Sequence, residues 1–282
     1  MISCRDIRKS FDRKEVLRGI SFEIPAGSIF GLLGPSGAGK TTLIRILTGQ
    51  LPCDSGTVTV FDKAPEAFTG ADRKKFGIMM DSFGVYERFS CGENLAVFAD
   101  LYGVPRSGIR DILSEVGLGD AYGKQASDLS KGMRARLQLA RAFMHTPEII
   151  FLDEPTGGLD PQTMRGIHRI ILDKKKRGYT IFLTTHNMEE ASKLCDRVAL
   201  LHEGRIIEEG RPEEICRRYD HQKRIRLHLS DGEDMEMERG ADAADGIASL
   251  LREGRVETIH STEPSLESVF LELTGRKLEE DE

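Results

Sequence analysis

Long apolar segments are absent from this chain of 282 residues, although 39% of its residues are hydrophobic and 30% are charged. No stretch approaches the roughly 18 uninterrupted apolar residues that a membrane-spanning helix requires. The opening residues, MISCRDIRKSF, place charged side chains where a secretory signal needs its apolar region. We therefore expect a protein that is not exported and does not cross a membrane by itself.

Paired cysteines are also absent. The five cysteines are scattered, odd in number and never arranged as C-x-x-C, at Cys4, Cys53, Cys91, Cys195 and Cys216. This usage indicates reduced thiols without a structural zinc site, and it favours a cytoplasmic location.

A strongly basic region is missing as well. From His221 onward the chain has 8 Lys/Arg against 16 Asp/Glu, a balance of −8, so the net charge of −6 leaves +2 for the first 220 residues. Because nucleic-acid binding depends on clustered cations, we expect no nucleic-acid partner. The one basic run, residues 174–177, precedes Gly178 and is typical of a helix C-terminus with a glycine cap.

A glycine-rich turn carries the clearest motif. In SIFGLLGPSGAGKTTLIRILTG, a strand over residues 29–33 leads into a helix that begins near Gly39, and the turn fits G-x-x-x-x-G-K-[ST]. Unless this is a chance match, backbone N–H groups and the helix dipole bind the phosphates of ATP, with Lys40 at the β- and γ-phosphates and Thr41 on Mg²⁺. The expected ATP-binding residues here are Gly34, Pro35, Ser36, Gly37, Ala38, Gly39, Lys40, Thr41 and Thr42.

Two adjacent carboxylates end a second apolar strand. The run IIFLDEP, residues 149–155, reads as a short strand buried on both faces that stops at Asp153 and Glu154. Like charges there repel each other, so they need a cation, a catalytic task or contact with solvent. Beside the phosphate loop, Asp153 would reach Mg²⁺ and Glu154 would act on the water that attacks the γ-phosphate, as a base or positioning group.

A third segment, DLSKGMRARLQLARAF, reads by itself as an ordinary helix capped by Ser130. Together with GPSGAGKTT, IIFLDEP, GGLD and LTTH, in this order and spacing, it makes residues 1 to about 215 resemble the nucleotide-binding subunit of ABC transporters. In that family the signature LSGGQ contacts ATP held by the other subunit. Ser130 and Gly132 match the signature, whereas Lys131 and Met133 replace a glycine and the glutamine.

The resemblance implies roles for further residues. His186 would be the switch histidine at the γ-phosphate, and Asp160 the aspartate of the loop at the dimer interface. Phe11 takes the position of the ring that stacks on adenine, with Val16 nearby, although an isolated phenylalanine is otherwise a core residue. After FGIMM most members have a glutamine that reaches Mg²⁺; here Asp81 either binds the metal or only caps a turn.

The expected fold class is α/β, a P-loop NTPase core of ABC type with an inserted helical signature subdomain. The ABC ATPase domain would span residues 1–220, with the helical subdomain at about 88–147. Residues 221–282 read as a small α+β appendage with an acidic tail. The appendage resembles the C-terminal extension of drug, lantibiotic and polysaccharide-type exporter ATPases.

The resemblance implies an ATP-hydrolysing subunit that dimerises around two ATP molecules with an identical or related chain. It would lie on the inner face of the cell membrane and drive a separate integral membrane permease, an exporter. An importer ATPase remains an alternative, because the motor chemistry is the same. A soluble ABC ATPase acting on ribosomes or DNA would usually have two nucleotide domains or a long coiled coil. A nucleoside-phosphate kinase would leave Ser130, Gly132 and His186 without a role.

Overall fold

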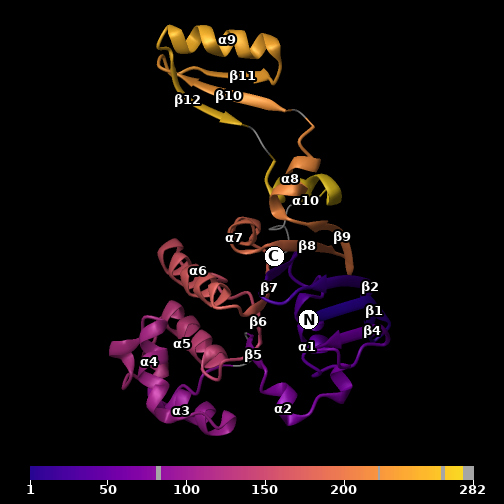
Figure 1. Ribbon diagram of the computed structural model, residues 1–282, viewed down its shortest axis with the longest axis vertical. Coiled ribbons are helices and arrows are strands. Elements are labelled where there is room, and N and C mark those ends of the chain that lie inside the picture. The colour runs from indigo at the N-terminus through magenta and orange to yellow at the C-terminus, as the bar shows by residue number, and fades with distance from the viewer. Residues whose placement is uncertain (81–83, 222, 262–263, 276–282) are drawn as a thin grey trace.

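The central feature of the fold is a six-stranded sheet (Figure 1). The computed structural model of the protein describes residues 1–80, 84–221, 223–261 and 264–275. Five strands run parallel and the edge strand β9 pairs antiparallel with β8. In sheet order the strands are β5 (Phe76–Met79), β6 (Ile149–Asp153), β7 (Thr180–Thr185), β3 (Ile29–Leu33), β8 (Arg197–His202) and β9 (Arg205–Gly210).

Strands β3, β6 and β7 are buried along their whole length, as their continuous apolar sequences predict. Because side chains alternate across a strand, Ile150 and Leu152 pack on one face of the sheet with the larger helices. Phe151 packs on the other face, where Phe30 and Phe182 stack with their ring centroids 6.0 Å apart. The sheet is therefore the middle layer of the protein.

A second sheet lies on the face that carries the phenylalanines, and its core residues join those of α1. It is antiparallel and consists of β2 (Lys14–Ile24), β1 (Ile2–Phe11) and β4 (Ser55–Val60), in that order. The helices that accompany it are α1 (Lys40–Leu47) and the short α2 (Gly70–Arg73).

The helical lobe predicted near residues 88–147 is formed by α3 (Cys91–Tyr102), α4 (Ile109–Glu115) and α5 (Lys131–Phe143), all between β5 and β6. It is followed by α6 (Pro161–Lys176) and α7 (Met188–Leu194), and short 3₁₀ turns lie at Pro65–Ala67, Arg106–Gly108, Gly119–Ala121 and Ala126–Asp128. The basic run does end α6, since Gly178 follows with φ of 89°.

The C-terminal segment divides between two places. After α8 (Pro212–Arg218), the strands β10 (Arg224–Leu229), β11 (Asp234–Glu238) and β12 (Val256–Ser261) and helix α9 (Ala241–Arg252) form a small unit with its own core. Helix α10 (Leu266–Thr274) instead lies beside α8 (Figure 1) and contributes Phe270 to the core of the first domain. The domain boundary at residue 220 stays a prediction. Helix α10 lies after that boundary in the sequence but packs against the core of the first domain.

The helices in the described ranges do not combine the length and apolar character needed to span a bilayer. The parallel strands have a direct consequence for function, because their carboxyl ends meet at one edge of the sheet. Asp153 pairs with Thr184 across β6 and β7, and Leu33 pairs with Thr185 across β3 and β7. The three chain segments that leave these strands therefore start side by side.

Candidate active site

The loop between β3 and α1 depends on two glycines for its path. Gly39 has φ of 109°, a conformation that side chains rarely adopt, and a Cβ atom there would lie 2.7 Å from Cδ2 of Leu17. Gly34 needs glycine for a different reason, because a Cβ atom there would collide with the backbone carbonyl oxygen of Leu201 on β8. These glycines allow the loop to wrap tightly before α1 begins at Lys40.

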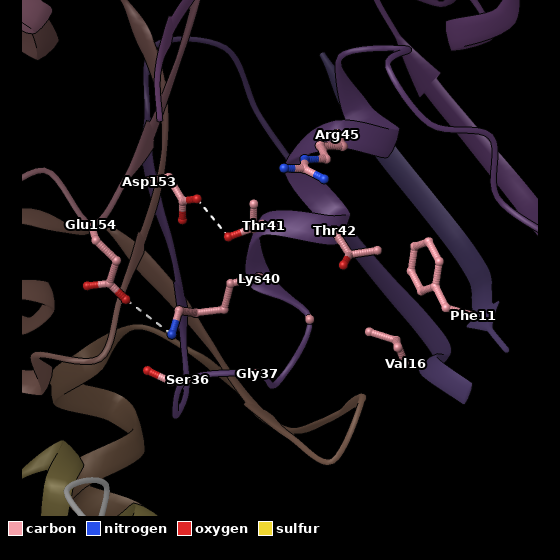
Figure 2. A pocket seen from close by; sticks show the side chains of 11 residues that line it. Phe11, Val16, Ser36, Gly37, Lys40, Thr41, Thr42, Arg45, Asp153 and Glu154 are labelled. Carbon is pink, nitrogen blue, oxygen red and sulfur yellow. Dashed lines mark hydrogen bonds and ion pairs between the residues drawn. The ribbon is translucent and has the colours of Figure 1, made fainter. Parts of the chain in front are cut away.

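A cleft of about 520 Å³ opens beside this loop (Figure 2). Figure 2 shows Phe11 and Val16 on one side of the start of α1, and Asp153 and Glu154 on the other. The ring of Phe11 is accessible, with 44% of the residue exposed. The cleft thus extends from an aromatic ring to an acid pair, and the predicted residues that line it are Phe11, Val16, Ser36, Gly37, Gly39, Lys40, Thr41, Thr42, Asp153 and Glu154.

Arg45 also lines the cleft and was not predicted. It lies one turn after Thr41 on α1, so the i, i+4 spacing of a helix could have identified it. Its guanidinium adds a second cation to the cleft on the helix that carries Lys40.

Lys40 is nearly enclosed, and its ammonium has three acceptors. Nζ donates to the carbonyl oxygens of Gly34 at 2.6 Å and Pro35 at 3.2 Å. It also lies 3.1 Å from Oε1 of Glu154, the ion pair drawn in Figure 2. A buried cation is stable only with such partners, and here they aim the charge at the phosphate loop.

Asp153 is held by hydroxyl groups from two elements. Oγ1 of Thr41 donates to Oδ2 at 2.7 Å, and Oγ1 of Thr184 donates to Oδ1. Thr184 was not predicted, because only the pairing of β6 with β7 places it opposite Asp153. A hydroxyl and a carboxylate in contact offer the hard oxygen ligands that Mg²⁺ prefers, so these residues fit that metal.

Glu154 and His186 form the second polar pair. Nδ1 of His186 lies 2.9 Å from Oε2 of Glu154, and Glu154 adopts a left-handed backbone conformation with φ of 48°. Burial raises the pKa of Glu154, but the hydrogen bond from His186 and the charge of Lys40 outweigh burial, so the pKa lies below its ordinary value. The bond to Glu154 raises the pKa of His186. Glu154 is therefore a carboxylate at neutral pH, as proton abstraction requires.

His186 and the remaining predicted residues do not line the cleft. Ser130 caps α5 and Asp160 caps α6, and neither residue lines the cleft beside α1. These two helix ends are neighbours, since a Cβ atom on Gly132 would lie 2.5 Å from Cγ2 of Thr163. Gly34, Pro35 and Ala38 belong to the loop without lining the cleft, and Asp81 lies outside the described residues.

A phosphate loop, an acid pair and a histidine at the carboxyl edge of a parallel sheet define a P-loop nucleotide-binding protein. The chain belongs to the ABC transporter family, whose model matches residues 17–157. It is an ATP-binding subunit that hydrolyses ATP, and the nucleoside-phosphate kinase alternative is thereby excluded.

Characterised relatives match nearly the whole chain. The fluoroquinolones export ATP-binding protein of Mycobacterium tuberculosis is 42% identical over 268 residues, which cover 93% of this chain and 88% of that protein. The linearmycin resistance ATP-binding protein of Bacillus subtilis is 32% identical, with 99% of both chains covered. The Nod factor export ATP-binding protein of Rhizobium etli is 34% identical, with 99% of this chain and 94% of that protein covered.

A solved structure agrees with this assignment. The ATP-binding subunit of an ABC transporter superposes with a TM-score of 0.70 at 25% identity, over 78% of this chain and 93% of that one. The predicted fold class, an ABC-type P-loop core, is confirmed.

Proposed function

We propose that this chain is the motor of an exporter and acts on a separate integral membrane permease from the inner face of the membrane. Support comes from relatives named for the export of fluoroquinolones and Nod factors and for linearmycin resistance. An importer partner is the competing possibility, and the identity of a permease that co-purifies with the tagged chain decides between them.

In the proposed mechanism, ATP lies along the cleft with its adenine on the ring of Phe11 and its phosphates in the loop. Backbone N–H groups of residues 36–41 and the ammonium of Lys40 bind the phosphate oxygens. Thr41 and Asp153 would hold Mg²⁺, which supplies positive charge against the phosphates. The adjacency of these two side chains supports their shared role.

Glu154 is the proposed general base for the attacking water, and His186 the proposed partner of the γ-phosphate. The depressed pKa of Glu154 keeps the carboxylate ready to accept a proton. The hydrogen bond to His186 fixes the direction in which the carboxylate points. The single observation that carries this proposal is that Lys40, Asp153 and Glu154 meet in one cleft.

A second ATPase chain is proposed to complete the site. Ser130, Gly132 and Asp160 lie on the ends of α5 and α6, outside the cleft of their own chain. Such residues reach ATP only if the cleft of another copy, or of a related chain, faces them. Hydrolysis would then require two chains with two ATP molecules between them.

The substitution Glu154→Gln tests the proposed base, because an amide keeps the shape of the side chain but does not take the proton. We expect ATP to bind at least as tightly, since one negative charge near the phosphates is removed, while phosphate release falls by about 100-fold or more. Binding of a fluorescent ATP analogue and release of phosphate are measured on the same preparation. A hydrolysis rate equal to that of the wild type contradicts the role of Glu154.

A further inference from the structure

Glu190 is a fully buried carboxylate on α7 that takes no part in the cleft itself, because its side chain is 0% exposed. Oγ1 of Thr156 donates to its Oε1 at 2.6 Å, and Oγ1 of Thr185 donates to its Oε2 at 2.8 Å. Nε2 of His168 lies 3.0 Å from Oε1. A carboxylate costs several kcal/mol to bury without partners, so its position behind the active site calls for an explanation.

The three partners of Glu190 come from three different segments. Thr156 follows Glu154 by two residues, Thr185 directly precedes His186, and His168 lies on α6. These contacts span sequence separations of 34, 5 and 22 residues. Glu190 therefore ties together the two loops that carry the polar pair of the active site.

The same place also fixes the start of α7. The backbone N–H of Asn187 donates to Oγ1 of Thr185 at 3.0 Å, and the backbone N–H of Glu190 donates to Oδ1 of Asn187 at 2.9 Å. The hydroxyl of Thr185 thus donates to Glu190 and accepts from the backbone N–H of Asn187. A helix anchored in this way gives Glu190 little freedom to move away from its partners.

The pair Glu154 and His186, which the two loops carry, needs such support. His186 is half exposed, with 50% of its side chain accessible, and Glu154 has the strained φ of 48°. Strained conformations cost about 1–3 kcal/mol each and persist only where the surrounding structure holds them. The hydrogen bond between Glu154 and His186 is too exposed to hold two loops in register by itself.

We propose that Glu190 is a positioning residue for ATP hydrolysis, which sets the distance and direction between Glu154 and His186 through the hydroxyls of Thr156 and Thr185. This inference rests on the proposed role of Glu154 as the base. Glu190 touches neither nucleotide nor water in this mechanism. It acts by holding the two loops that carry Glu154 and His186, whose side chains contact the water and the γ-phosphate in the proposed mechanism.

The substitution Glu190→Gln keeps the volume but replaces one acceptor oxygen with a donor amide, which opposes at least one of the three partners. We expect kcat to fall by about tenfold to 100-fold, because misplacement of a catalytic group by about 1 Å has an effect of this size. KM for ATP stays within about twofold, because the binding residues lie elsewhere. The matched control is Glu189→Gln, on the same helix but 78% exposed and paired with Lys193; it behaves like the wild type.

A second pair of variants keeps the test decisive if Glu190→Gln fails to fold. Thr156→Val removes the hydroxyl and preserves the shape, and Thr156→Ser retains the hydroxyl. We expect Thr156→Val to lower kcat with little change in KM, whereas Thr156→Ser keeps most of the wild-type rate. Equal rates for valine and serine, or equal losses in kcat and affinity, overturn the inference, because a structural role alone does not separate these quantities.

Combining Glu190→Gln with Glu154→Gln in one protein distinguishes the positioning role of Glu190 from the proposed role of Glu154 as the base. If Glu190 acts through Glu154, adding Glu190→Gln to Glu154→Gln lowers the residual rate little further. A normal rate for Glu154→Gln alone refutes the proposed base. A slow Glu154→Gln together with a normal Glu190→Gln refutes only the positioning role.

Discussion

Lys40 carries a positive charge into a position where 7% of its side chain is exposed, and Gly34, Pro35 and Glu154 are its partners. We expect Lys40→Ala to weaken ATP binding and turnover together, each by about tenfold or more, because hydrogen bonds to charged groups contribute about 1.5–3 kcal/mol. Nucleotide titration and steady-state phosphate release measure the two effects.

The matched control for Lys40 is Lys193→Ala, on the exposed side of α7. Its ammonium pairs with Glu189, and neither residue lines the cleft, so we expect affinity and rate to stay at the wild-type values. If Lys40→Ala also kept both values, the glycine-rich loop would not be the ATP site, whatever its pattern.

His186 gives a prediction about ionisation. Its pKa is raised by the hydrogen bond with Glu154 and by the charge of that carboxylate, whereas the charge of Lys40 lowers it. Glu154→Gln removes the negative charge of residue 154 and keeps the positive charge of Lys40, so we expect the pKa of His186 to fall. NMR titration of the histidine ring protons measures this change, with His228 as the control because its pKa is raised by Asp234 in another unit. An unchanged His186 titration contradicts the contact.

At the scale of elements, α10 is the part of the C-terminal segment that stabilises the ATPase domain. Phe270 is buried against the ring of His202, with the centroids 5.8 Å apart, whereas the next residue, Leu271, is 38% exposed. We expect Phe270→Ala to lower the free energy of unfolding by about 3–5 kcal/mol and Leu271→Ala by less than about 1 kcal/mol. Urea unfolding compares them, and similar losses would contradict the packing of α10.

The sequence predicts those elements whose signals are local. The consecutive residues Gly39, Lys40 and Thr41 predict the phosphate loop without further information, and the apolar run before Asp153 predicts its strand. The partner Thr184 is 31 residues away and is set by the register of β6 and β7. Local spacing does not encode such pairings, and for the same reason the hydrogen bonds of Glu190 were not foreseen.

The C-terminal segment also shows that local sequence patterns do not encode contacts between distant segments. The spacing of Leu266, Val269 and Phe270 predicts a helix with one apolar face. It does not say which surface that face covers, and the face packs with the core beside α7 and α8 rather than with the small sheet. The sequence therefore indicates an α+β appendage after residue 220 but not the surface against which its last helix packs.

At the scale of the whole molecule, the proposed mechanism divides the catalytic site between two places on one chain. Residues of α1 line the cleft, whereas Ser130 and Asp160 cap α5 and α6 and do not line it. The small C-terminal unit stands at the opposite end of the molecule from the helical lobe in Figure 1. In the proposed dimer, the cleft and the starts of α5 and α6 would face a second ATPase chain.

The most direct test of a shared site is the mass of Glu154→Gln in solution, because we expect this variant to bind ATP without consuming it. Size-exclusion chromatography with light scattering is run with ATP and Mg²⁺, and then with ADP as the control. We predict a species of twice the chain mass of 31.4 kDa with ATP and a monomer with ADP. A variant that binds ATP and stays monomeric at every protein concentration would contradict the claim that two copies of this chain close around the nucleotide.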